Sequence, residues 1–220
     1  MMNTFDPKKD YGFTKIGVRE ISQLPEWDLF RYKKIQYIFE TSEIIFDFGR
    51  SSRALSELFA DILKEREFKT IDLRDDIGVD IVTDICVMDC VQSQSVDAII
   101  CSAVLQFVYD PFKAVEELYR ILKPKGKMFV YVAWIYNYCG DPSGKFLDYY
   151  RFSPDGIKYL FREFKHVEIS PVRGRIGTIL NLTKKFGKRS IFQKYLGGLI
   201  DKMDSIDFNN ASGYNVYLEK

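Results

Sequence analysis

The fold is decided by residues 96–134, which read VDAIICSAVLQFVYDPFKAVEELYRILKPKGKMFVYVAW. The stretch opens with a short apolar run, residues 96–101, and closes with a longer one, residues 127–134. Between them, Asp110-Pro111 is an N-cap residue followed by proline at the first helical position. The helix that follows carries apolar residues at helical spacing, namely Val115, Leu118, Tyr119 and Leu122, and stops at Lys123–Gly126. A strand, a helix and a buried central strand in this order are the repeating unit of a parallel α/β sheet.

The same alternation of apolar runs and helical periodicity extends to both sides of this stretch. Further strands are predicted at residues 44–49, 68–72, 79–84, 166–170 and 214–218, and further helices at 25–41, 55–63, 153–164 and 192–203. The pattern predicts a Rossmann-like, doubly wound, mostly parallel seven-stranded sheet with helices on both faces. We expect residues 1–42 to form an N-terminal helical cap segment and residues 43–220 to form the domain itself.

The composition favours a folded protein without a strong charge preference. Of the 220 residues, 46% are hydrophobic and 15% aromatic, which is enough for a sizeable core and argues against disorder. The net charge of +1 provides no overall field that would attract nucleic acid or an anionic surface. Residues 1–9 lack the apolar part of a signal peptide, and no apolar run approaches the roughly 20 residues of a membrane span. We therefore expect a cytoplasmic protein.

The cysteines do not predict a metal site. Cys86 and Cys90 form one close pair, but the other two cysteines, Cys101 and Cys139, stand apart, and His166 is the single histidine. A structural zinc site needs two closely spaced pairs of ligands. Reduced thiols in a cytosolic protein are the favoured interpretation.

Polar residues end four of the predicted strands: Asp47, Asp72, Asp84 and Ser102. In open α/β sheets, ligands bind beyond the carboxyl ends of the strands, near the point where the strand order reverses. Carboxylates there can accept hydrogen bonds from ribose hydroxyls, an adenine amine or the amino group of a ligand. Gly49, directly after the first strand, would let such a ligand approach the backbone closely. We expect these residues to share one ligand.

Residues 44–54, IIFDFGRSSRA, resemble motif I of the class I methyltransferases that depend on S-adenosylmethionine (SAM), a hydrophobic strand followed by Asp/Glu-x-Gly-x-Gly-x-Gly. Residues 104–111, VLQFVYDP, and 116–127, EELYRILKPKGK, resemble later segments of the same domain, of the type 11-like methyltransferases. Residues 148–154, DYYRFSP, are similar to an element of members associated with bacterial surface-glycan biosynthesis. The likeness covers about residues 43–170.

The resemblance implies SAM as cofactor and S-adenosylhomocysteine as product. The acid and the glycine after the first strand would line the methionine part of SAM, the acid after the second strand would hold the ribose, and the acid after the third would face the adenine. The implied set of cofactor residues is Asp47, Gly49, Ser51, Asp72, Leu73, Asp84, Ile85 and Ser102.

The sequence departs from the family pattern at two places. Ser51 and Arg53 stand where the family has its second and third glycines. Serine is small enough for this position, whereas arginine replaces a glycine that gives room for close packing or for the ligand. Gln106 and Phe107 replace an acidic residue and a histidine frequent in the family, which removes one candidate general base. We therefore assign no catalytic residue.

The loop after the fifth strand carries the candidate substrate residues Asp148, Tyr149, Tyr150 and Arg151. Arg151 could bind a carboxylate or phosphate in bidentate fashion, or it could tie the loop down through an ion pair, and both interpretations stay open. The predicted function is methyl transfer to an oxygen or nitrogen nucleophile of a small molecule or glycan-type acceptor. The alternative is a catalytically silent methyltransferase-like domain that serves as a binding or scaffolding protein. A nicotinamide-dependent oxidoreductase is disfavoured, because no G-x-G-x-x-G run follows the first strand.

Residues 173–203 contain a run of basic side chains without an acid up to Lys194, followed by an apolar stripe from Phe192 to Met203. A solvated helical face explains this pattern, and so does a surface that contacts a membrane or an anionic substrate. Nucleic acid is disfavoured as a partner, because no motif for base stacking or groove reading is present. The sequence predicts no oligomeric state.

Overall fold

The computed structural model describes residues 24–183, 204 and 207–220. Within them, seven strands form one sheet in the order β3-β2-β1-β4-β5-β7-β6. The strands are β1 (Ile44–Phe48), β2 (Glu67–Asp72), β3 (Ile81–Val82), β4 (Val96–Ser102), β5 (Leu122–Ala133), β6 (His166–Val172) and β7 (Gly213–Glu219). Strands β1 to β5 pair in parallel, and β7 runs antiparallel to both β5 and β6. The predicted doubly wound, mostly parallel sheet is confirmed.

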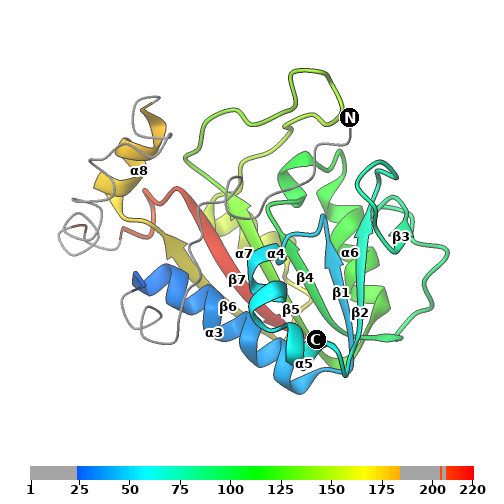
Figure 1. The fold of residues 1–220 in the computed structure, drawn as a ribbon. Coiled ribbons are helices and arrows are strands. Elements are labelled where there is room, and N and C mark those ends of the chain that lie inside the picture. The colour runs from blue at the N-terminus through cyan, green and yellow to red at the C-terminus, as the bar shows by residue number, and fades with distance from the viewer. Residues whose placement is uncertain (1–23, 184–203, 205–206) are drawn as a thin grey trace.

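Helices cover both faces of the sheet (Figure 1). On one face lie α3 (Glu26–Thr41), α4 (Arg53–Leu58) and α5 (Ala60–Leu63), and on the other lie α6 (Pro111–Ile121) and α7 (Pro154–Leu160). A 3-10 turn, η1 (Leu105–Phe107), follows β4, and α8 (Arg175–Leu182) projects beyond the edge strand β6. The described part of the predicted cap segment, α3, packs on β5, β6 and β7, on a face of the sheet rather than over the strand ends.

Alternating side chains of the central strands fill two hydrophobic cores. In β4, Ala98 and Ile100 belong to the core under α3 and α4, whereas Ile99 and Cys101 belong to the core under α6 and α7. Both sets are fully buried. A strand whose successive side chains enter opposite cores must be apolar at successive positions, which is why residues 98–101 of β4 and 128–133 of β5 are almost all apolar.

The predicted N-cap Asp110 is present, and Ser153 caps α7 in the same way. The Asp110 side chain accepts a hydrogen bond from the backbone N–H of Lys113 at 3.1 Å, and Ser153 Oγ accepts one from that of Gly156 at 3.1 Å. Each cap is followed by a proline at the first helical position, where no N–H is needed. The apolar residues of α7 and its C-terminal turn are buried: Ile157, Leu160, Phe161 and Phe164.

The Asp110→Ala variant is expected to lose about 1 kcal/mol of stability, because the first turn of α6 would keep an unsatisfied N–H. In a chain of this size, this corresponds to a melting temperature lower by about 2–4 °C. Differential scanning calorimetry measures the shift. Glu116→Ala, at an exposed site of the same helix, is the control and should leave the melting temperature unchanged; equal shifts in both variants would contradict a capping role.

Three predicted elements differ from the structure. The third strand was predicted at 79–84 but contains only Ile81 and Val82. At Asp80, the side-chain carboxylate takes the place of a backbone ladder partner, because it accepts hydrogen bonds from the backbone N–H and the hydroxyl of Thr70. The helix predicted at 55–63 is divided at Phe59 into α4 and α5. The fifth strand begins at Leu122, which pairs with Val96 before a shift in register, rather than at residue 127. The helix predicted at 192–203 lies outside the described residues.

Candidate functional site

The ends of β1, β2 and β4 form the candidate site. Strand β1 lies between β2 and β4, so the strand order reverses there, and ligands of such sheets bind at this point. The carboxyl ends of the parallel strands are at the top of Figure 1, where the loop between β5 and α7 rises over them. Three of the predicted residues, Asp47, Asp72 and Ser102, stand at or next to these ends.

The Asp47 carboxylate organises the loop after β1. Its side chain is buried, and its oxygens accept hydrogen bonds from the backbone N–H of Ser51 at 2.9 Å and of Ser52 at 3.1 Å. The hydroxyls of the same two serines also donate to it, at 2.8 and 2.6 Å. Burial raises the pKa of Asp47, and the hydrogen bonds from the serines oppose this rise. The carboxylate therefore holds the loop in place from below.

Ser51, at the position of the family's second glycine, links β1 to β4. Its hydroxyl donates to Asp47 and accepts a hydrogen bond from the backbone N–H of Ser102 at 3.0 Å. The serine hydroxyl therefore connects the ends of β1 and β4 by two hydrogen bonds, which a glycine could not form. Arg53, at the third glycine position, is the first residue of α4.

Gly49 occupies a position that only glycine suits. Its φ of +69° lies in the left-handed region, and its N–H donates to the backbone oxygen of Ile71 at 2.7 Å. A Cβ atom at this residue would lie 2.9 Å from Val104 Cγ2 and 3.9 Å from Asp72 Oδ2. Arg50 follows with a φ of +48° and donates from Nη1 to the backbone oxygen of Ile77 at 2.7 Å, which connects the loops after β1 and β2.

Asp72 presents one carboxylate oxygen toward Gly49. Its Oδ1 accepts hydrogen bonds from the backbone N–H of Arg74 at 2.9 Å and from Arg74 Nε at 3.3 Å. In the described part of the chain, no donor contacts Oδ2, and the side chain is only 15% exposed. A carboxylate fixed by one oxygen, with the other directed at a glycine, is suited to accept hydrogen bonds from a ligand. The next residue, Leu73, is exposed.

Asp84 lies in a turn after β3 and is joined to residues that follow β4. Its Oδ1 accepts from the backbone N–H of Cys86 at 2.8 Å, and its Oδ2 accepts from the Tyr109 hydroxyl at 3.2 Å. The hydrogen bond with Cys86, followed by desolvation and the nearby charges, raises the pKa of Tyr109 to about 12. Ile85 is buried, so its side chain packs in the core under the site.

Asp148 and Arg151, two of the four predicted substrate residues, are paired with each other. The guanidinium makes a bidentate ion pair with the carboxylate, with Arg151 Nη2 at 2.6 Å from Asp148 Oδ2. Nη2 also donates to the backbone oxygen of Asn137, and the carboxylate accepts from the backbone N–H of Cys139. Arg151 lowers the pKa of Asp148. The pair ties the loop down, so the ion-pair interpretation of Arg151 holds in this structure.

The other two substrate candidates, Tyr149 and Tyr150, have exposed rings and anchored backbones. Both of their N–H groups donate to the backbone oxygen of Gln106 in η1, at 2.8 and 3.2 Å. The Tyr150 hydroxyl donates to the backbone oxygen of Tyr109. These contacts bring the predicted substrate loop against the turn that follows β4.

The substrate loop also reaches the loop after β2. Lys145 forms an ion pair with Asp76 at 2.9 Å, and the ring of Phe146 lies between the Arg74 guanidinium and Phe107. Asp72, a predicted cofactor residue, and the predicted substrate loop are thus connected through Arg74. The site is covered from above by these contacts.

Sequence reasoning did not include several residues of this site: Ser52, Arg74, Gln106, Tyr109 and Phe146 were not predicted as binding residues. Ser52 and Arg74 follow predicted residues closely, so a search for donors within five positions of each strand-end acid would have found them. Phe146 lies 72 positions after Arg74 along the chain, and no local pattern connects the two.

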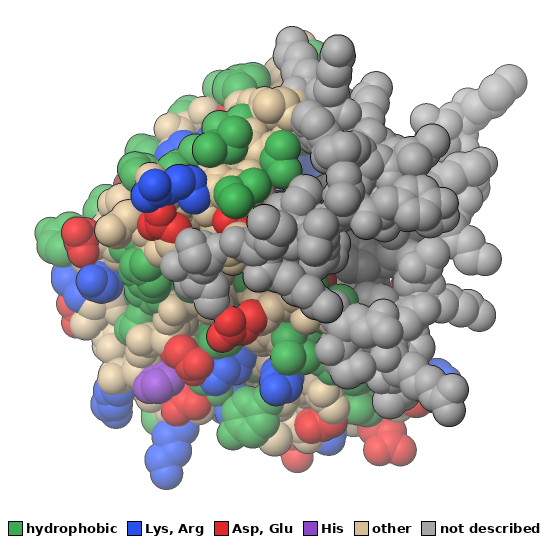
Figure 2. Space-filling view, turned by 90° about the vertical axis from the view of Figure 1, so that its left-hand side faces the viewer, with side chains coloured by type: hydrophobic (Ala, Val, Ile, Leu, Met, Phe, Trp, Pro, Cys, Tyr) green, Lys and Arg blue, Asp and Glu red, His purple; other side chains and the backbone are tan. Residues whose placement is uncertain are grey.

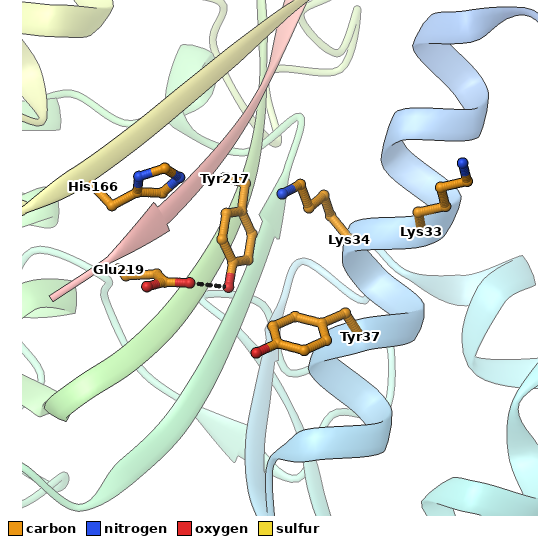
Figure 3. A pocket seen from close by; sticks show the side chains of 6 residues that line it. All are labelled: Lys33, Lys34, Tyr37, His166, Tyr217 and Glu219. Carbon is orange, nitrogen blue, oxygen red and sulfur yellow. Dashed lines mark hydrogen bonds between the residues drawn. The ribbon is translucent and has the colours of Figure 1, made fainter.

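A separate hollow of about 450 Å³ lies between α3 and strands β6 and β7 (Figure 3). Lys34 points into it and pairs with Glu168, and the Tyr217 hydroxyl donates to Glu219 at 2.7 Å. His166 lines the hollow with a half-exposed ring. The hollow is on the face of the sheet, away from the carboxyl ends of the parallel strands. It is not part of the candidate site.

The described part of the basic segment is held by local contacts. Arg173 donates to Ser212 and lies over the Trp27 ring, and Arg175 pairs with Asp207. On the face shown in Figure 2, acidic and basic side chains alternate over the described surface. Residues 184–203, which carry most of the predicted basic and apolar surface, lie outside the described residues.

The described residues show no sign of a metal site or a membrane span. They contain no group of three or more His, Cys, Asp or Glu side chains placed to hold a metal ion. None of their helices combines the length and apolar character needed to cross a membrane. All four cysteines are free, with Cys86 and Cys101 buried and Cys90 exposed.

Comparison with known proteins places this geometry in a class. The chain resembles solved structures of SAM-dependent methyltransferases. The enzyme from Archaeoglobus fulgidus is 16% identical, with a TM-score of 0.56 and coverage of 93% of this chain and 95% of that one. The enzyme from Mesorhizobium loti is 14% identical, with a TM-score of 0.54 and coverage of 91% and 100%. Phosphoethanolamine N-methyltransferase 2 of Haemonchus contortus in complex with SAM is 14% identical, with a TM-score of 0.51 and coverage of 99% and 60%.

The fold is therefore that of the SAM-dependent methyltransferases. Within it, residues 54–130 match the family model described as a methyltransferase domain. No curated protein sequence matches the chain. The matched residues extend from the start of α4 to the middle of β5, and they include Asp72, Asp84 and Ser102 of the candidate site.

Proposed function

We propose that the protein is a SAM-dependent methyltransferase that transfers a methyl group to an oxygen or nitrogen nucleophile of a small molecule or glycan-type acceptor. The observation that carries this proposal is the arrangement at the end of β1 and β2. Asp72 Oδ2 has no donor among the described residues and lies beside Gly49, which has a left-handed backbone conformation and no side chain. The match of residues 54–130 to the methyltransferase domain supports the same function.

The residues present fit SAM. Asp72 Oδ2 would accept hydrogen bonds from the ribose hydroxyls, and Gly49 would allow the methionine part to approach the backbone. Asp84 with Ile85 would face the adenine, and Ser102 with Ser51 would border the cofactor at the end of β4. Asp47 would not contact the cofactor itself, because its oxygens accept hydrogen bonds from the serines of the loop. It would hold that loop in the shape that binds the cofactor. Leu73, beside the ribose acid, would be covered by the cofactor.

SAM supplies a methyl group on a sulfonium, which is already a good leaving group. The protein must then hold the nucleophile in line with the methyl carbon and exclude water. The loop that carries Phe146 and Lys145 covers the site and serves this purpose. No histidine lies at the strand ends, since His166 belongs to the opposite end of β6. We therefore propose no general base, and the proton of the nucleophile passes to solvent when the methylated product leaves the site.

The acceptor would contact the tyrosines rather than the arginine. Arg151 is occupied by Asp148, so its guanidinium does not offer a free site for a carboxylate or phosphate. Tyr149 and Tyr150 present exposed rings beside η1, and aromatic faces suit the apolar face of a sugar or another ring. Together with the resemblance of residues 148–154, this favours a glycan-type acceptor.

Two other predictions from the sequence stay predictions. One is the boundary at residue 42 between the N-terminal cap segment and the domain. The other is a contact of residues 173–203 with a membrane or an anionic substrate.

The Asp72→Asn variant is expected to bind SAM about 10- to 100-fold more weakly than the wild-type protein, because hydrogen bonds to a charged group contribute about 1.5–3 kcal/mol. Isothermal titration with SAM and with S-adenosylhomocysteine measures both affinities. Asp75→Asn removes a neighbouring exposed acid and is the matched control, with affinity unchanged.

Two outcomes of this titration have different meanings. Absence of binding by the wild-type protein at millimolar SAM would contradict the proposed function as a whole. Equal affinities of wild-type protein and Asp72→Asn would contradict only the assignment of the ribose site.

A catalytically silent domain is the second candidate, and one observation favours it. Arg50 reaches from the glycine loop to Ile77, and Arg74 occupies Asp72 Oδ1, so cationic side chains lie at the place where the cationic sulfonium compound would enter. Under this alternative, the chain would serve as a binding or scaffolding protein and would bind neither SAM nor S-adenosylhomocysteine in the titration above.

A further inference from the structure

Gln106 is a buried polar residue with an unused oxygen. Its side chain belongs to η1 and the residue is only 3% exposed. Its Oε1 is enclosed, and no donor in the described part of the chain contacts it. Buried polar atoms in folded proteins are almost always hydrogen-bonded, so an unpaired one calls for an explanation, such as a ligand that supplies the partner.

Hydrogen bonds on both sides of the site hold the backbone at Gln106 and at Ser102, four residues before it. Its carbonyl oxygen accepts hydrogen bonds from Tyr149 and Tyr150 of the substrate loop. Four residues earlier in the chain, the N–H of Ser102 is bound to Ser51 of the glycine loop. Gln106 therefore stands between the proposed cofactor site and the proposed acceptor loop, on a fixed backbone. The unpaired amide oxygen is thus not a consequence of a loosely held segment.

Neighbouring polar side chains are already occupied. The Tyr109 hydroxyl donates to Asp84, the Tyr150 hydroxyl donates to the backbone of Tyr109, and Arg151 is paired with Asp148. Among these described groups of the acceptor side, Gln106 is the one with an acceptor atom left without a donor. A ligand that enters here would meet a hydrogen-bond acceptor, not a free charge.

We propose that Gln106 is an acceptor-positioning residue whose Oε1 accepts a hydrogen bond from the O–H or N–H of the methyl acceptor. This inference rests on the proposed methyltransferase function. It names the chemistry of the acceptor: the nucleophile carries a hydrogen that it can donate to Oε1, as in a neutral hydroxyl or an amine, whereas an ionised carboxylate or phosphate oxygen has no hydrogen to donate.

A neutral amide orients the nucleophile but does not take its proton. In the transfer, the bond between methyl carbon and sulfur breaks and its electron pair stays on sulfur. The new bond from oxygen or nitrogen to the methyl carbon forms, and the displaced proton passes to water. Gln106 is unchanged by this step. Its contribution is to hold the nucleophile's lone pair toward the methyl carbon.

The test compares the wild-type protein with Gln106→Met, which keeps the size of the side chain and removes the amide. Thermal unfolding without ligand, titration with SAM, and transfer of label from methyl-tritiated SAM to catechol, phenyl β-glucoside and tyramine are measured for both proteins. Gln106→Met is expected to melt about 2–4 °C higher, because an unpaired buried group is removed. Its SAM affinity should be unchanged, and its label transfer should fall at least 10-fold.

Thr178→Val is the matched control, since the Thr178 hydroxyl is also buried and has no partner among the described residues, but belongs to α8, outside the site. It should raise the melting temperature and leave label transfer unchanged. A lower melting temperature in Gln106→Met would show that the fold uses the amide and would overturn the inference. Unchanged label transfer in that variant would also overturn it. Loss of SAM binding by the wild-type protein would instead refute the proposed function on which it rests.

Discussion

The Asp47→Ala variant is expected to lose detectable SAM binding and to be about 3 kcal/mol less stable than the wild-type protein. The carboxylate accepts hydrogen bonds from two backbone N–H groups and two hydroxyls, all belonging to Ser51 and Ser52. Its removal leaves these donors buried without a partner, and each unsatisfied group costs about 1–3 kcal/mol unless the loop moves. A loop that moves to reach water no longer places Gly49 beside Asp72.

Calorimetry measures both effects. A loss of 3 kcal/mol corresponds to a melting temperature lower by about 6–12 °C in a chain of this length. The SAM affinity should fall more than 100-fold, as judged by titration at a temperature where the variant is folded. Asp47→Asn keeps the size and one accepting oxygen, so it should lie between the two proteins in both measurements.

Asp61→Ala is the control for removing an acid. Asp61 is an exposed residue of α5, and its ion-pair partner among the described residues is the exposed Lys64. This variant should change neither the melting temperature nor the affinity. If Asp47→Ala bound SAM as the wild-type protein does, the conformation of residues 49–52 would not depend on this carboxylate, and the proposed role of Asp47 would be contradicted.

The elements that the sequence predicts well are those with strong local patterns. The helix α6 begins at Pro111 and the strand β4 at Val96, as predicted, because a capping residue and a continuous apolar run mark them. Strand β3 was predicted too long, since its edge position lets Asp80 bond to Thr70 instead of extending the ladder. Nothing in the local sequence indicates the break at Phe59, and only the packing of its ring against Tyr32 and Phe39 distinguishes that position.

In the candidate site as well, residues marked by a local pattern could be predicted, and contacts between distant loops could not. Asp47, Gly49 and Ser102 could be predicted because parallel strands bring their carboxyl ends to one edge. The bridge from Ser51 to Ser102 spans 51 positions and the ion pair of Lys145 with Asp76 spans 69. Such contacts depend on how two loops approach each other over the sheet, which no local pattern determines. Whether Arg151 is free or paired was open for the same reason.

The Asp148→Ala variant is expected to release the substrate loop while SAM binding is retained. The Asp148 carboxylate is almost fully buried and holds both Arg151 and the backbone N–H of Cys139. Breaking a buried ion pair from one side costs about 3–5 kcal/mol, and the partial exposure of Arg151 reduces this to about 2–3 kcal/mol here. In the described part of the chain, none of the residues proposed to bind the cofactor has a hydrogen bond or ion pair with Asp148, so the titration with SAM should give the wild-type affinity.

Hydrogen exchange followed by mass spectrometry detects the release. Peptides from residues 135–152 should exchange faster in the variant, while peptides from β1 and β4 should keep their protection. Asp155→Ala, at an exposed acid in the first turn of α7, is the control and should leave residues 135–152 protected. Wild-type protection of these residues in Asp148→Ala would contradict the role of the ion pair.

The difference in the free energy of unfolding between Asp148→Ala and the wild-type protein should become smaller as the pH is lowered into the acid range. Arg151 lowers the pKa of Asp148 in the folded protein, so the pair contributes its full stability above the unfolded value of about 3.9. As the pH falls below that value toward the lowered folded pKa, the carboxylate binds a proton more readily in the unfolded chain, and the contribution is lost. Denaturant titrations at pH 7 and at acid pH should therefore show the difference between the two proteins shrinking with acidification. A difference that stayed constant with pH would mean that Asp148 stabilises the loop without its charge, through the hydrogen bond to Cys139 alone.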